Sequence, residues 1–227
     1  MFLACFPVTI IKGVSAIPSD PNYLKKVNPE FRQKAKVFCL AVVYGAEEAR
    51  IGQAMKVDFK QAKNIITSYL RAYPGLKRYM NSCDHSVKTK GMVKTEFGRV
   101  RHLGEAMSIW TLYGPNIMDY KKARQSGNSD LRRKLKNCLN NGKNFRIQGL
   151  AAHIVNRAAI AISRRLKEEG LDAYLALQVH DQLIAIARED QAQRVKEIMQ
   201  DCMENTTKIS IPLIAEPEIA DNIAESH

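Results

Sequence analysis

The sequence contains one stretch, RQKAKVFCLAVVYG (Arg32–Gly45), that predicts a helix with a charged row along one side. No Pro or Gly interrupts Phe31 to Tyr44, and Gly45 stands where such a helix would end. Arg32, Lys36, Leu40 and Tyr44 follow one another at intervals of four, so they lie along one side of it. This side of the predicted helix therefore changes from cationic to apolar.

Two cations one helical turn apart suit the oxygens of a triphosphate. Arg32 offers a planar fork of donors, and Lys36 offers a point charge. Leu40 and Tyr44 would then lie near a base and a sugar. The same pattern is also typical of a surface helix with two solvated cations and a buried apolar side, so this stretch alone leaves both interpretations open.

A second stretch, LALQVHDQLIA (residues 175–185), predicts a β-hairpin with polar residues at its tip. Two apolar runs, Ala173–Val179 and Leu183–Ala187, are separated by His180, Asp181 and Gln182. A carboxylate held rigidly and exposed there suits Mg²⁺, which takes one or two protein oxygens together with substrate phosphates. Aspartate is also a common turn residue, and a single histidine is commonly structural, so the hairpin needs supporting motifs.

The remaining pattern predicts an α+β fold, because helices come first and a hairpin follows. Residues 13–30 contain Gly13, Pro18, Pro21 and Pro29 and predict an irregular segment. Residues 113–143 predict a loop with a short helix inside it. The other expected elements are helices at Asp58–Ala72, Gly75–Lys88, Asn144–Glu169 and Asp190–Asn205, a short hairpin at Met92–His102 and a strand at Ile209–Ala215.

Composition favours a folded protein with a polyanionic partner. The chain has 227 residues, with 35 Lys and Arg against 23 Asp and Glu, a net charge of +12 and a pI near 9.5. Its five cysteines are far apart and form no CxxC pair, so a reducing cytoplasm is expected, in the nucleoid or in a phage-infected cell. Pro7 interrupts the apolar start, MFLACFPVTIIK, so neither a signal peptide nor a membrane partner is expected.

Several motifs in one order resemble family A of the DNA polymerases, the polymerase I family. Arg32, Lys36, Tyr44 and Gly45 match its R-x3-K-x7-YG fingers helix, and QVHD (residues 178–181) matches its palm hairpin. TEFGR (95–99), NFRIQGLAA (144–152) and the carboxyl terminus IPLIAEPEIADNIAESH also agree, so the similarity extends from about Val27 to His227. Unrelated motifs in the family's order at plausible spacings make the resemblance specific.

The resemblance implies a fold and a division of the chain. It implies a helical fingers subdomain over residues 1–142, with the irregular amino-terminal segment and a basic loop at 113–142. Residues 143–227 would form the carboxy-terminal part of an antiparallel palm, in the order helix, β-hairpin, helix, strand.

The resemblance also implies site residues and a reaction. The nucleotide would be bound by Arg32, Lys36, Leu40 and Tyr44, the DNA by Arg99, Arg101, Asn144, Gln148 and His180, and the metal by Asp181. Asp181 and Lys36 would be catalytic, Lys36 as a proton donor to pyrophosphate. Arg99 and Arg101 suit solvent equally well. The implied activity is that of a DNA-directed DNA polymerase, in which two Mg²⁺ ions assist attack of a primer 3′ hydroxyl on a deoxynucleoside triphosphate.

The chain departs from the family pattern where a second carboxylate is needed. The family's DxSxxExR segment, which carries its first metal-binding aspartate, would fall before Met1. We therefore expect the chain alone to be inactive, and a second chain to supply the thumb, the upstream palm and that aspartate. Gln182 replaces an acidic residue and Leu40 an aromatic one. The stretch from Trp110 to Asn141 is longer and more basic than its family counterpart.

Three interpretations remain open. The chain is the carboxy-terminal part of a split polymerase, an inactive DNA-binding or assembly module derived from one, or the product of an interrupted gene. All three share the α+β fold. They differ in whether primer extension appears when the missing aspartate is supplied.

Overall fold

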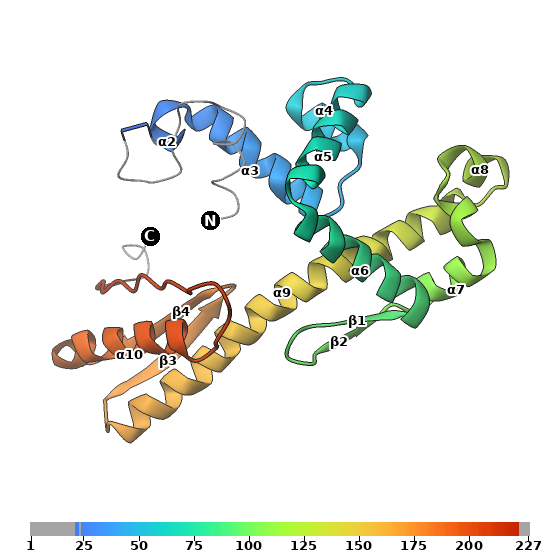
Figure 1. Ribbon diagram of the computed structural model, residues 1–227. Coiled ribbons are helices and arrows are strands. Elements are labelled where there is room, and N and C mark those ends of the chain that lie inside the picture. Colours follow the sequence, from blue (N-terminus) through green and yellow to red (C-terminus); the bar gives the residue numbers. More distant parts are fainter. Residues whose placement is uncertain (1–20, 23, 223–227) are drawn as a thin grey trace. The chain divides into compact units, whose positions relative to one another are not determined.

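The computed structural model describes residues 21–222 except Tyr23, and its elements divide into two compact units (Figure 1). Of the described residues, the first unit holds those up to Val93 together with Val100–Phe145, and the second holds Lys94–Arg99 and those from Arg146 onward. Of the irregular segment predicted at 13–30, residues 13–20 lie outside the described residues, and a short helix, α2 (Leu24–Val27), occupies part of the rest.

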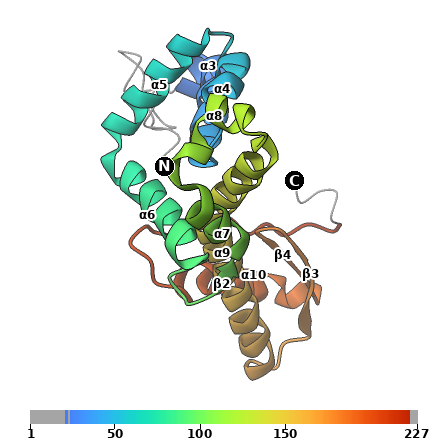
Figure 2. The same ribbon diagram turned by 90° about the vertical axis from the view of Figure 1, so that its right-hand side faces the viewer.

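The first unit begins with helices whose ends are set by local sequence. Helix α3 (Pro29–Val43) starts after Asn28, whose side-chain oxygen accepts a hydrogen bond from the Phe31 amide at 2.9 Å. Helix α4 (Glu48–Met55) was not predicted. Helix α5 (Phe59–Ala72) starts with a reciprocal capping box between Asp58 and Gln61, and α6 (Pro74–Lys90) follows it directly (Figure 2). The predicted helices in this region are confirmed.

Apolar side chains from these helices form the core beneath α3. Phe38, Cys39 and Val42 pack with Ile51 of α4 and with Ala62 and Tyr69 of α5, and each is at most 3% exposed. The rings of Phe38 and Tyr69 meet edge to face with their centroids 5.3 Å apart. One side of α3 is therefore packed against this core, and the other side does not contribute to it.

A second core in this unit joins α6 to later elements. Strands β1 (Met92–Lys94) and β2 (Val100–His102) confirm the predicted short hairpin. They are followed by α7 (Gly104–Tyr113), a 3-10 turn η1 (Gly114–Met118) and α8 (Tyr120–Gln125). The buried members of this core are Val87, Val93, Leu103, Ala106, Ile109, Ile117, Ala123, Leu135 and Leu139.

Helix α9 (Ser129–Glu168) corrects the prediction that residues 113–142 form a loop with only a short helix inside it. The predicted helix at Asn144–Glu169 is the carboxy-terminal part of α9, which starts fifteen residues earlier. Gly142, which suggested a break, lies inside the helix, and a Cβ added there would come 2.6 Å from Cγ2 of Val87. This glycine allows α9 to approach α6 and does not end the helix.

The second unit is a hairpin packed on two helices. Strands β3 (Ala173–Val179) and β4 (Gln182–Ala187) are antiparallel, and η2 (Glu189–Gln191) leads into α10 (Ala192–Asn205). One face of the hairpin packs against Ile162 and Leu166 of α9 and Ile198 of α10. Arg194 of α10 also pairs with both carboxylate oxygens of Glu169, at 2.7 and 3.0 Å. The predicted hairpin and final helix are confirmed, although α10 begins two residues later than expected.

The strand predicted at Ile209–Ala215 is wrong. Residues 208–222 contain no regular strand, because no described strand pairs with them. Pro212 and Pro217 have no amide proton to offer a ladder, and the Ala215 amide instead donates to the Glu204 carboxylate at 2.9 Å. The α+β class of the fold is unaffected by this correction.

No helix among the described residues is long and apolar enough to cross a membrane.

Candidate nucleotide and metal site

The predicted row on α3 lies on the side of the helix away from its core. Lys36 is exposed, Tyr44 is 37% exposed, and Arg32 and Leu40 are half-buried. Lys34, on the same helix, is paired with Glu30, whereas no ion pair with a described residue holds Arg32 or Lys36. Two cations therefore lie one turn apart on α3 as the spacing predicted, and their binding of a triphosphate stays a prediction.

The buried side of α3 carries groups that stay uncharged at neutral pH. Burial raises the pKa of the Cys39 thiol, so this cysteine stays protonated and unreactive at neutral pH. Burial also raises the pKa of Tyr69, with Cys39 beside it as a second cause. These groups hold the helix in place and take no part in charge chemistry.

Gly45 ends α3 for two reasons. Its φ of 75° lies in the left-handed region, which glycine adopts at no steric cost. A Cβ added at Gly45 would also lie 2.2 Å from Oδ1 of Asn140, whose amide nitrogen donates to the Gly45 carbonyl at 3.3 Å. Asn140 on α9 therefore fixes the carboxyl end of the candidate nucleotide helix. The sequence carries no signal for this contact, because the two residues are far apart in the chain.

The hairpin tip is a two-residue turn made by His180 and Asp181. Val179 pairs with Gln182 across it, and His180 has a φ of 55°, in the left-handed region. Asp181 is exposed at the tip, as predicted, and its carboxylate is open to a cation. The described residues contain no group of three His, Cys, Asp or Glu side chains that could hold a metal ion.

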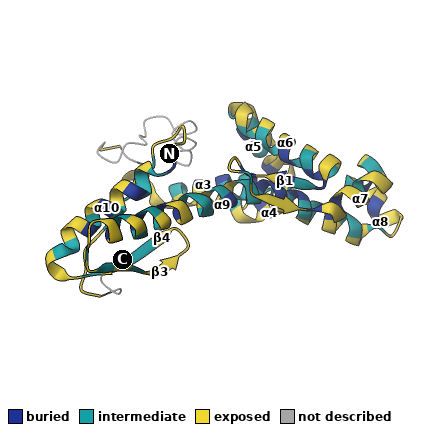
Figure 3. Cartoon of the chain, turned by 90° about the horizontal axis from the view of Figure 1, so that it is seen from below, coloured by how far each residue is buried: buried dark blue, intermediate teal, exposed yellow. Residues whose placement is uncertain are grey.

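A β-bulge at Ala176 sets which side chains of β3 face the helices. Leu175 pairs with Ala185 and Leu177 with Ile184, so Ala176 is the extra residue. Beyond the bulge Gln178, opposite the inward-facing Leu183, points toward α9 and donates to Asn156 at 3.4 Å. The outer face of the hairpin is left apolar and exposed (Figure 3), with Tyr174, Leu177, Val179 and Ile186 each between 43% and 60% exposed.

The TEFGR turn is held against α9 within the second unit. Its shape depends on Gly98, whose φ is 88°, and on Thr95, whose hydroxyl accepts from the Arg99 amide at 3.2 Å. Phe97 stacks on His153 with ring centroids 4.2 Å apart, and Arg146 pairs with Glu96 at 2.9 Å. Sequence reasoning missed the Phe97 and His153 pair, because nothing in either motif marks the other ring.

The predicted DNA-binding residues lie on these elements. Arg99 and Arg101 are both exposed, and the Arg101 guanidinium lies 5.9 Å from the Phe145 ring centroid. Asn144 and Gln148 are neighbours one turn apart on α9. Gln148 is exposed, and the half-buried Asn144 leaves its Oδ1 without a hydrogen-bond partner among the described residues. The exposed Gln148 amide suits a base edge in a minor groove, whereas the Asn144 Oδ1 is buried.

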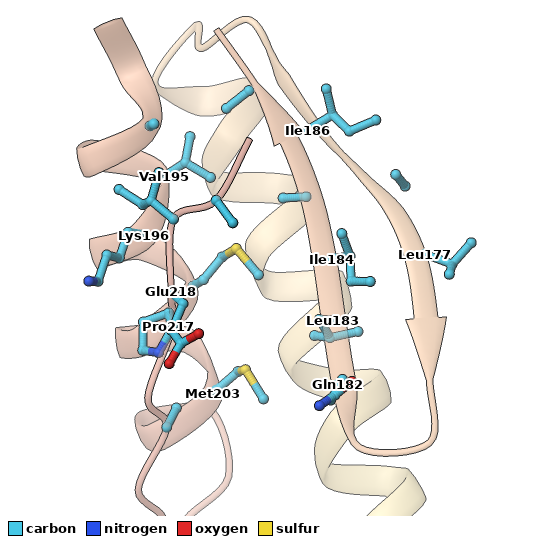
Figure 4. Close-up of a pocket in the computed structure, with 18 of the residues that line it drawn as sticks. Leu177, Gln182, Leu183, Ile184, Ile186, Val195, Lys196, Met203, Pro217 and Glu218 are labelled. Carbon is cyan, nitrogen blue, oxygen red and sulfur yellow. The ribbon is translucent and has the colours of Figure 1, made fainter. Parts of the chain in front are cut away.

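A cavity in the second unit differs in character from the row on α3. It has a volume of about 860 Å³ and lies between β4, α10 and residues 214–222, with Leu183, Met203 and Pro217 around it (Figure 4). Asp181 and Gln182 line it from the hairpin tip, and most of its wall is apolar. Such a lining does not suit a triphosphate.

Comparison with known proteins gives the class of this chain. The family model for DNA polymerase family A matches residues 19–225. DNA polymerase I of Bacillus caldotenax is 33% identical over 188 residues, which is 83% of this chain and 19% of that protein. DNA polymerase I of Pseudomonas aeruginosa is 31% identical over 204 residues, which is 90% of this chain and 20% of that protein. The chain therefore spans about a fifth of the length of these curated relatives.

A solved structure agrees with the sequence relatives. It is described as the POL domain of Pol1 from M. smegmatis in complex with DNA primer-template and dNTP. It superposes with a TM-score of 0.69 at 25% identity, covering 84% of this chain and 30% of that domain. The fold is therefore that of a part of a polymerase domain. The chain belongs to DNA polymerase family A.

Proposed function

We propose that this chain supplies the nucleotide-binding helix and one metal-ligand carboxylate of a DNA-directed DNA polymerase, which adds deoxynucleoside triphosphates to a primer 3′ end. The observation that carries the proposal is the row of Arg32 and Lys36, which faces away from the core of α3 and has no carboxylate partner among the described residues. The M. smegmatis domain that this chain resembles binds primer-template DNA and dNTP.

The residues of the chain have separate tasks in this reaction. Arg32 and Lys36 bind and orient the triphosphate, so that the primer 3′ hydroxyl meets the α-phosphorus in line with the leaving pyrophosphate. A bond forms from the 3′ oxygen to that phosphorus as the bond to pyrophosphate breaks. The hydroxyl proton leaves to solvent, and Lys36 gives a proton to the pyrophosphate. Leu40 and Tyr44 lie beside the sugar and base.

Asp181 is the residue of this chain that would hold Mg²⁺. The exposed, rigid position of its carboxylate at the hairpin tip suits a hard cation. When bound, two Mg²⁺ ions stabilise the attacking and leaving oxygens. A single carboxylate is too few ligands for two such ions, so the proposal requires a further carboxylate beside Asp181, and the described residues hold no group that supplies it.

A polymerase segment with the thumb and upstream palm would supply that carboxylate. The exposed apolar face of the hairpin supports this requirement. A face of this kind on a two-stranded sheet is typical of a surface that another part of a domain covers.

Primer extension tests the proposal directly. We expect no extension by the 227-residue chain alone, and extension when it is mixed with a polypeptide that ends in the family's DxSxxExR segment. Asp181→Asn should abolish extension in the mixture. Lys36→Ala should raise KM for the nucleotide and lower kcat, because it loses both a phosphate contact and a proton donor. Unchanged kinetics for Lys36→Ala would remove its assigned role.

An inactive DNA-binding module is the alternative function. Gln182 favours it, because this neutral side chain stands beside Asp181 where the family has an acidic residue. If Gln182→Glu restores extension to an otherwise silent mixture, the chain is a degenerate polymerase whose lost charge explains its inactivity. If the mixture is active with Gln182 in place, the alternative is excluded.

A further inference from the structure

The cations at residues 103–143 differ in whether a carboxylate pairs with them. Residues 103–143 contain eight Lys and Arg against three Asp and Glu, a formal charge of +5. Five of the eight cations are paired with carboxylates, namely Arg132 and Lys136 with Glu47, Arg133 with Asp130, Lys134 with Glu105 and Lys143 with Asp84. The three that pair with no carboxylate among the described residues are Lys121, Lys122 and Arg124, all on α8.

The three cations point away from the buried side of α8. Ala123 is 2% exposed and anchors the helix in the core, and its three charged neighbours are all exposed on the remaining turn. Asp119 caps the helix, with its Oδ1 accepting from the Lys121 and Lys122 amides at 2.8 and 3.1 Å. The three charged side chains are therefore held on α8, a helix fixed by its cap and by the buried Ala123 (Figure 3).

An exposed aromatic ring lies beside these charges. Tyr120 begins α8 and is 59% exposed. The Arg132 guanidinium lies 5.5 Å from its ring centroid and is itself held by the Met118 carbonyl and by Glu47, each at 3.2 Å. A ring supported from one side by a fixed cation and open elsewhere can stack on a base.

We infer that Tyr120, Lys121, Lys122 and Arg124, here called the α8 surface, bind single-stranded DNA. Cations that form no ion pair with a described carboxylate suit phosphates, and the side-chain partner of Lys122 is the neutral Asn116, whose Oδ1 accepts from Lys122 Nζ at 3.1 Å. A tyrosine ring suits an unstacked base, which a duplex does not offer. A purely solvating surface would need no fixed aromatic ring beside its charges. The inference does not depend on nucleotidyl transfer by this chain.

Binding of a fluorescein-labelled oligothymidylate by the full chain tests this inference, with anisotropy measured over a series of salt concentrations. The triple variant K121Q/K122Q/R124Q should bind more weakly and reduce the slope of log affinity against log salt by about 2, since each lost phosphate contact removes ~0.7. The matched control, K60Q/K63Q/R71Q, removes the same charge from exposed positions on α5 and should leave the slope unchanged. Equal effects of the two triples would overturn the assignment to α8.

The aromatic part of the inference has its own test. Tyr120→Ala should weaken single-strand binding about tenfold, whereas Tyr120→Phe should retain it, because stacking needs the ring and not the hydroxyl. Circular dichroism of each variant checks that the chain remains folded. Equal loss in Tyr120→Phe, no loss in Tyr120→Ala, or duplex of the same length bound as tightly as single strand would each overturn the single-strand assignment.

Discussion

His180 has a backbone conformation that most residues other than glycine avoid. Its φ of 55° lies in a region that costs a non-glycine residue about 1–2 kcal/mol, although histidine is one of the residue types found there more often. Such strain persists where surrounding structure imposes it, and it is concentrated at functional sites. A glycine would form the same turn without this cost. We therefore expect the imidazole to matter for function, and the predicted DNA-binding role of His180 stays a prediction.

A pair of substitutions at His180 tests this account. His180→Gly should raise the free energy of unfolding by up to about 1 kcal/mol, because strain is relieved, although a more flexible unfolded chain offsets part of the gain. His180→Val should lower it by about 1 kcal/mol, since a β-branched residue tolerates positive φ poorly. Urea denaturation followed by circular dichroism gives both values.

The kinetic consequence separates side chain from backbone. Both variants should slow primer extension in the reconstituted mixture, because both lack the imidazole. If His180→Gly extends primers as fast as the unaltered chain, the side chain has no role there, and the left-handed turn alone is what the site requires.

The four-residue spacing predicted the row of side chains on α3. It did not predict the contact that fixes the carboxyl end of that helix. Intervals of four place Arg32 and Lys36 on one side of any helix. The buried Phe38 and Cys39 show which side of α3 packs against the core. The contact of Asn140 with Gly45 depends on tertiary packing between distant segments, so no local pattern indicates it. The assigned roles of the site residues stay predictions until the kinetic tests are done.

Helix α9 shows why element boundaries were harder to predict than elements. The strong apolar repeat after Asn144 was recognised, whereas the preceding polar, cationic turns were interpreted as a loop because Gly142 suggested a break. The partners of those cations, including Glu47 and Asp84, lie elsewhere in the chain. The bulge at Ala176 was equally invisible, since one inserted residue leaves an apolar run looking continuous.

Gly142→Ala tests whether close packing explains the glycine. Helix propensity alone would favour alanine by about 1 kcal/mol. The new Cβ would meet Val87, a side chain that is 0% exposed and has no room to move, so we expect a net loss of about 1–3 kcal/mol. Gly75→Ala in the first turn of α6 is the control, because its nearest atom would be 4.0 Å away on the flexible Arg78. Stabilisation by both substitutions would refute the packing explanation.

At the scale of the whole molecule, cores define the units better than sequence motifs do. Two apolar clusters lie in the first unit and one in the second. The sequence suggested two parts, and the division into fingers and palm at residue 142 stays a prediction. The assignment of Lys94–Arg99 to the second unit depends on the contacts of Phe97 and Glu96 with α9, which chain order does not reveal.

Separate cores predict separate stability, and this bears on function. Ile198 and Leu135 are both 0% exposed, one in each unit, and replacing either by alanine should cost about 2–5 kcal/mol. Ile198→Ala should speed hydrogen exchange in β3, β4 and α10 while α3 keeps its protection, and Leu135→Ala should do the reverse. Binding of a deoxynucleoside triphosphate should therefore survive Ile198→Ala, because Arg32 and Lys36 rest on the first unit alone. Hydrogen exchange that becomes faster to the same extent in both units would show instead that the two units unfold together. In that case α9, which has residues in both units, would couple α3 to the hairpin that carries Asp181.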